Sequence, residues 1–110
     1  MDNNSRGSIQ GTIHSIYDRK FYSVTAPLNA GRRLIVTLLP DQNFNGLLRL
    51  FDDKGDTLVP SANNRKDGAT DVLTYRGVIP GQAYYICVEG YSADQHEGTG
   101  NYELRVEFVM

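Results

Sequence analysis

Apolar and polar residues alternate most clearly in residues 82–90. A period of two is typical of a β-strand with one buried face. The turn residues Pro80 and Gly81 precede this segment and Gly90 closes it, so both ends stop the strand. We expect a central strand whose buried face carries Tyr84, Ile86 and Val88 and whose opposite face carries Tyr85, Cys87 and Glu89.

Shorter alternating or apolar segments recur along the rest of the chain, separated by Gly, Pro, Asn and Asp. No window places apolar residues at helical spacing for three turns. The pattern predicts an all-β fold, an antiparallel, jelly-roll-like β-sandwich of about eight strands with the first strand at a sheet edge. The other expected strands are 8–16, 21–26, 34–39, 47–51, 57–59, 72–78 and 102–108.

Size and charge narrow the classes of protein that this chain can represent. Its 110 residues fit one domain spanning 1–110, in which we expect residues 1–7 to be a flexible N-terminal segment. The net charge of −2, with both signs interspersed, argues against nucleic acid as a partner. No apolar segment reaches the roughly 20 residues of a membrane-spanning helix. We therefore expect a monomer that binds neither nucleic acid nor membrane.

Several motifs occur in the order found in one family of accessory domains. Together they resemble the bacterial pre-peptidase C-terminal domain, a β-sandwich that follows the catalytic domains of secreted proteases and collagenases. The similarity spans nearly the whole chain, but Lys20 stands where the family often has a second acidic residue. The matching positions are Gly11, Asp18 and Tyr22, then Gly31, then Leu48, Leu50, Asp52 and Gly55, then the stretch Gly-x-x-Tyr-Tyr-Ile-x-Val-x-Gly from Gly81, and finally Gly100, Tyr102, Leu104 and Val106.

The resemblance implies a non-catalytic accessory or binding module of a larger, secreted bacterial protein, and not an enzyme. Its partner would be an extracellular polymer or protein. The alternative is a structural or assembly domain that contacts neighbouring domains of the same chain and has no ligand of its own. We expect an extracellular or cell-surface location as part of a longer exported chain, and a cytoplasmic one if this is the complete protein.

Two groups of oxygen-bearing side chains are candidate calcium sites. The resemblance implies the first, because some family members bind calcium with the segment before the first strand and the Asp turn; here these residues are Asp2, Asn3, Asn4 and Asp18. The second follows from spacing, because residues 41–52 begin like an EF-hand loop, with Asp41, Asn43, Asn45 and Asp52 at ligand positions. Pro40 and two strands flank that loop where helices belong, so an ordinary polar turn is the favoured interpretation. We expect no required cofactor.

Catalytic chemistry has little support in the sequence. His14, His96 and Cys87 are the only imidazole and thiol groups, and no Gly-x-Ser-x-Gly motif is present. The aromatic residues are better candidates for function, because they offer large contact areas for a partner. We expect a binding face that includes Tyr85 on the central strand and Tyr91 in the loop after it.

Overall fold

The computed structural model describes residues 5–15, 18–28, 32–41, 44, 46–60, 70–90 and 100–109. These residues form seven β-strands and no helix, so this part of the chain contains no helix that is long and apolar enough to cross a membrane. The strands are β1 Ser5–Ile13, β2 Arg19–Thr25, β3 Arg33–Pro40, β4 Gly46–Phe51, β5 Asp71–Tyr75, β6 Ala83–Gly90 and β7 Gly100–Val109.

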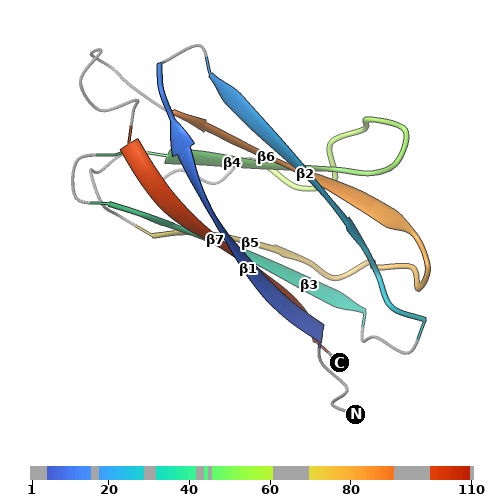
Figure 1. The fold of residues 1–110 in the computed structure, drawn as a ribbon. Helices are drawn as coiled ribbons and strands as arrows, with labels where there is room; N and C mark the ends of the chain where they lie inside the picture. Colours follow the sequence, from blue (N-terminus) through green and yellow to red (C-terminus); the bar gives the residue numbers. More distant parts are fainter. Residues whose placement is uncertain are drawn as a thin grey trace.

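The strands form two facing sheets, which confirms the predicted antiparallel sandwich (Figure 1). One sheet has the order β1-β7-β3-β5 and the other has the order β2-β6-β4. All strand pairs are antiparallel. Each strand is followed in the chain by a strand of the opposite sheet, as in a jelly roll. β1 is at the edge of its sheet and β6 is at the centre of the other, both as the sequence predicted.

The core forms because alternate residues of the central strands point into the space between the sheets. Leu34, Val36 and Leu38 of β3 have no exposed surface. On β6, Ile86 and Val88 are equally buried. Each such side chain contributes roughly 1.5 to 3 kcal/mol by leaving water. The remaining core is supplied chiefly by Leu48 and Leu50 of β4 and by Tyr102, Leu104 and Phe108 of β7.

The predicted strand at 57–59 is wrong in its extent. Phe51 and Thr57 form an isolated bridge, and the Leu58 amide donates to the Leu50 carbonyl at 3.0 Å. The chain thus turns back onto the edge of β4, where an eighth jelly-roll strand would lie. Pro60 follows at once and has no N–H to extend the pairing. The three-residue segment makes this contact but no ladder.

The N-terminal boundary also differs from the prediction. β1 begins at Ser5 and not at residue 8, and its pairing with β7 runs from Ser5 opposite Phe108 to Ile13 opposite Gly100. Residues 5–7 are therefore part of the sheet and not of a flexible segment. The remainder of that predicted segment, residues 1–4, lies outside the described residues.

A pair of tyrosines joins the two sheets near the end of β1. The hydroxyl groups of Tyr22 on β2 and Tyr102 on β7 form a hydrogen bond across the sandwich. Burial, and then this hydrogen bond, raise the pKa of Tyr102, so its hydroxyl stays protonated. A Cβ atom at Gly11 would lie 2.3 Å from the Tyr102 hydroxyl oxygen and 2.9 Å from that of Tyr22. Glycine at position 11 is therefore what leaves room for this hydrogen bond.

We predict that Gly11→Ala lowers the free energy of unfolding by about 1 to 3 kcal/mol, because the methyl group must displace both tyrosine rings. Gly7→Ala is the matched control on the same strand, since a Cβ there meets no atom within 4 Å. The control should be neutral or stabilising by up to about 1 kcal/mol, the usual gain of Ala over Gly in a strand. Equilibrium denaturation of both variants checks this. Equal effects would contradict the role assigned to Gly11.

Candidate functional site

The alternation of β6 places Tyr85 on the outside of the sandwich, as predicted. Tyr84 is 1% exposed and faces the core, where its hydroxyl accepts the Ile79 amide at 2.8 Å. Tyr85 is 38% exposed on the opposite face. Its neighbours across the sheet are Ser23 on β2 and Phe51 on β4. The candidate binding residue therefore sits on a strand whose inner side is fixed by the core.

Three aromatic side chains gather on this outer face. Phe21 is 62% exposed and lies two positions along β2 from the residue opposite Tyr85. Phe21, Phe51 and Tyr85 line one open hollow of about 440 Å³ together with Asp52, Asp53 and Gly55. We call the three rings the aromatic face. Rings held on paired strands present a large apolar area with little side-chain entropy to lose on binding.

Of these three rings, only Tyr85 was predicted from the sequence as a binding residue, and its role in binding stays a prediction. Phe51 was missed because it ends an apolar strand, and only the pairing of β4 with β6 brings it beside Tyr85. Phe44, which precedes β4, has no exposed surface, and its ring contacts Tyr102 with centroids 6.1 Å apart. Tyr91, the other predicted binding residue, lies outside the described residues.

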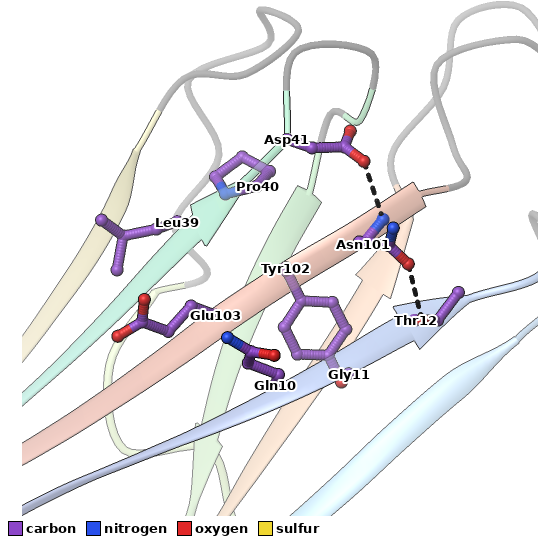
Figure 2. A pocket seen from close by; sticks show the side chains of 9 residues that line it. All are labelled: Gln10, Gly11, Thr12, Leu39, Pro40, Asp41, Asn101, Tyr102 and Glu103. Atoms are coloured by element: carbon purple, nitrogen blue, oxygen red, sulfur yellow. Dashed lines mark hydrogen bonds between the residues drawn. The ribbon is translucent and has the colours of Figure 1, made fainter.

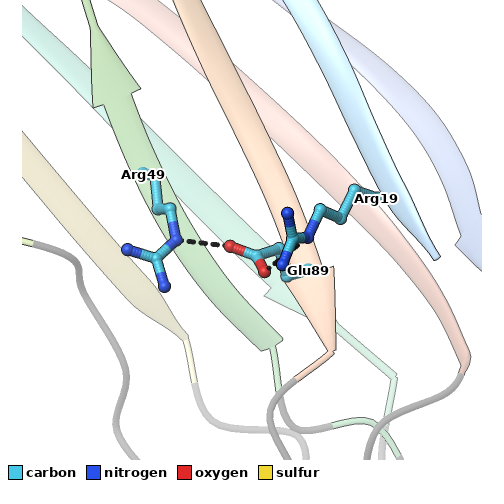
Figure 3. A network of polar contacts seen from close by, with 3 residues as sticks. All are labelled: Arg19, Arg49 and Glu89. Carbon is cyan, nitrogen blue, oxygen red and sulfur yellow. Dashed lines mark hydrogen bonds and ion pairs between the residues drawn. The ribbon is translucent and has the colours of Figure 1, made fainter. Parts of the chain in front are cut away.

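An ion network continues the outer face beyond the aromatic rings (Figure 3). Glu89 on β6 accepts from Arg19 on β2 at 3.0 Å and from Arg49 on β4. The Glu89 side chain is 13% exposed, whereas the two arginines are largely exposed. One carboxylate thus links all three strands of the sheet and keeps the arginine stems along its surface.

Cys87 lies between the aromatic face and the ion network. It is on the outer side of β6 but only 1% exposed, with Phe21 and Arg49 as its cross-strand neighbours. Burial raises its pKa from the ordinary 9.0 to about 11. The thiol is therefore neutral at physiological pH, which suits a packing role and not that of a nucleophile.

The four-stranded sheet carries a second hollow on its own outer face, with a volume of about 530 Å³ (Figure 2). Its polar groups come from adjacent strands, so nothing in the sequence order marked them as one site. We call this site the polar hollow. Its polar side chains are Gln10, Thr12, Asp41, Asn101 and Glu103, and Leu39 and Pro40 lie on the same rim.

In the first predicted calcium site, the carboxylate of Asp18 forms a hydrogen bond within its own turn. Asp18 accepts the His14 backbone amide at 3.0 Å, and the Lys20 ammonium lies 3.6 Å away. The His14 hydrogen bond, helped by the Lys20 charge, lowers the pKa of Asp18. Its proposed companions Asp2, Asn3 and Asn4 lie outside the described residues. Lys20, which stands where the family often has a second acidic residue, thus forms an ion pair with Asp18.

The second predicted calcium site, residues 41–52, is not one continuous loop that could surround an ion. β4, Gly46–Phe51, lies within it and separates Asp41 from Asp52 by the length of a six-residue strand, about 20 Å. Asp52 instead accepts the amides of Lys54 and Asp56, both at 2.9 Å, and closes a turn. Asp41 and Asp52 therefore cannot ligate one ion; Asn43 and Asn45 lie outside the described residues.

The described part of the chain brings no three His, Cys, Asp or Glu side chains together in a metal-binding arrangement. His14 is exposed just after β1, and Cys87 is buried in β6. His96 lies outside the described residues. The described geometry thus offers surfaces for binding and no nucleophile paired with a base.

We predict that Cys87 resists a thiol-specific disulfide reagent at pH 8 in the folded protein and reacts rapidly once denaturant unfolds it, because the thiolate is the reactive form. Since the folded pKa is the higher one, the contribution of Cys87 to stability is present below pH 9.0 and is lost as the pH rises to about 11. Phe21→Ala should speed labelling by uncovering the thiol. Rapid labelling of the folded parent would contradict this burial.

No protein-family model and no curated protein matches the sequence of this chain. Solved structures do share its fold. The pre-peptidase C-terminal domain of a collagenase from Bacillus anthracis has a TM-score of 0.66 at 18% identity, covering 92% of this chain and 88% of that one. The Yersinia pseudotuberculosis-derived mitogen has a TM-score of 0.66 at 18% identity, covering 96% and 86%.

A third structure with the same fold is that of a lysozyme inhibitor. PliG of Aeromonas hydrophila, a periplasmic inhibitor of g-type lysozyme, has a TM-score of 0.59 at 18% identity, covering 92% of this chain and 83% of that one. At such identities the likeness concerns the fold alone. It confirms the predicted resemblance to the fold of the pre-peptidase C-terminal domain.

Proposed function

We propose that this chain is a non-catalytic binding module that attaches a longer, exported bacterial protein to an extracellular polymer or protein. The aromatic face of Phe21, Phe51 and Tyr85 is the observation that supports this function. It lies on the outside of a rigid sheet, and 62% of Phe21 and 38% of Tyr85 are exposed. An exported location accords with the periplasmic protein and the collagenase domain that share the fold.

The chemistry of the face favours a long ligand with flat apolar surfaces. The rings lie in an open hollow on a sheet and not in an enclosed cavity, so a chain can extend past them in both directions. Glu89 offsets one of the two positive charges of Arg19 and Arg49 beside the rings. Asp52 and Asp53 line the hollow itself, so charges of both signs surround the rings. Contact with such a ligand would come from ring area, with polar groups at the margin.

A pull-down on insoluble collagen, chitin and cellulose tests this proposal. We expect retention of the parent by at least one material, and a loss of about tenfold in affinity for Tyr85→Ala or Phe21→Ala, since buried aromatic anchors carry much of a binding energy. Val72→Ala is the matched control, because Val72 is 51% exposed on the other sheet. Unchanged retention of both aromatic variants would place the binding face elsewhere.

The alternative function is a structural domain that contacts neighbouring domains. It is favoured by Leu28 and Ile79, which are 84% and 57% exposed in turns at one end of the sandwich. The Leu28 side chain lies against Gly81, in the turn that follows Ile79. Apolar side chains clustered in this way are typical of contacts between proteins. Retention by none of the three materials would favour this function.

We propose that the module needs no calcium, because the described carboxylates of Asp18, Asp41 and Asp52 each accept a backbone amide and do not converge. Thermal melting in excess calcium and in chelator should therefore coincide. A folded-state site at a hundredfold excess over its dissociation constant would add about 2.7 kcal/mol, which is readily detected. A large shift abolished by Asp18→Ala would instead reveal an ion held by that turn.

A further inference from the structure

The polar hollow lies on the outer face of the four-stranded sheet, on the other sheet of the sandwich from the aromatic face. Two rows of side chains cross this sheet from β1 over β7 to β3. Gln10 pairs with Glu103, which pairs with Leu39. Thr12 pairs with Asn101, whose backbone is hydrogen-bonded to Asp41. The strand pairing thus fixes where each polar group stands.

The second row is held in place by hydrogen bonds of its own. The Thr12 hydroxyl donates to the Asn101 side-chain oxygen at 2.7 Å, and Asp41 Oδ2 accepts the Asn101 backbone amide at 3.1 Å (Figure 2). These contacts orient the Asn101 carboxamide, whose Nδ2 carries two further donors. The Gln10 carboxamide in the first row can both donate and accept. The hollow therefore offers fixed donors and acceptors side by side.

The charges of the hollow select against ionic ligands. Among the described residues that line it there is no Lys or Arg, so this lining carries no charge that attracts an anion. Of the two described carboxylates, Glu103 already accepts from Arg105 at 2.7 Å, and Asp41 accepts a backbone amide, which reduces the attraction for a cation. Hydroxyl groups, which both donate and accept, match this mixture of carboxylates and carboxamides. Leu39 and Pro40 supply an apolar rim for C–H groups.

We propose that the polar hollow binds a neutral saccharide unit, such as one or two rings of a glycan. Its volume of about 530 Å³ falls within the range of small-molecule sites. Gln10 and Asn101 would donate to and accept from ring hydroxyls, Asp41 and Glu103 would accept, and Pro40 would contact the apolar side of the ring. This site is independent of the aromatic face and extends the proposed function with a second binding surface.

The test is a titration of the ¹⁵N-labelled protein with cellopentaose, chitopentaose and maltohexaose, and separately with spermidine as a cationic probe. We expect at least one oligosaccharide to shift the amide signals around Gln10–Thr12 and Asn101–Glu103, and spermidine to leave them unchanged. Gln10→Ala should weaken the affinity about fivefold, as expected for one lost hydrogen bond. Thr74→Ala, an exposed position on β5 of the same sheet, should stay within about twofold of the parent.

Charge-neutral variants separate a saccharide from a cation. Glu103→Gln and Asp41→Asn retain an acceptor oxygen but remove the charge, so saccharide affinity should fall by less than about threefold. A strong response to spermidine that these variants abolish would overturn the proposal in favour of a cation site. No shift with any of the three sugars, or shifts confined to Phe21, Phe51 and Tyr85, would also overturn it. The last result would leave the aromatic binding face supported.

Discussion

The other features of this molecule depend on which face of β6 points into the core. Its period of two sends Tyr84, Ile86 and Val88 into the core and Tyr85, Cys87 and Glu89 to the outside. A shift of one residue would exchange these sets and would bury a carboxylate beside an aromatic hydroxyl. The core thereby fixes the register, and the register fixes the outer surface. The outward position of Tyr85 is thus determined by residues that face the core.

The two sheets are joined by contacts that tolerate little change. Gly11, Tyr22 and Tyr102 come from three strands and meet at one point, where the absence of a side chain on one permits a hydrogen bond between the other two. Each hydroxyl is satisfied by the other, so neither is left without a partner in an apolar space. This explains why a glycine in the interior of a strand, which lowers strand stability in isolation, stabilises the whole sandwich here.

The outer faces of the two sheets differ in chemistry although the same alternation produces both. The three-stranded sheet carries three aromatic rings and a carboxylate bound by two arginines. The four-stranded sheet carries carboxamides, carboxylates and a hydroxyl around a shallow hollow. The three rings and the charged and carboxamide side chains of both surfaces lie outside the buried core cluster. A shared fold with proteins at 18% identity is therefore compatible with different ligands, because the fold specifies the scaffold and the outer side chains specify the partner.

Local pattern was sufficient to predict the fold class, the central position of β6 and the outward direction of Tyr85, because a period of two is a property of consecutive residues. The local pattern did not predict that residues 57–59 form only an isolated bridge with β4. These residues are strand-like, but the segment is too short to form a ladder. Phe51 beside Tyr85, Cys87 beneath Phe21 and Arg49, and Asn101 between Thr12 and Asp41 are decided by strand order and register. These pairings join residues far apart in the chain, so only the tertiary structure could bring the side chains of each surface together.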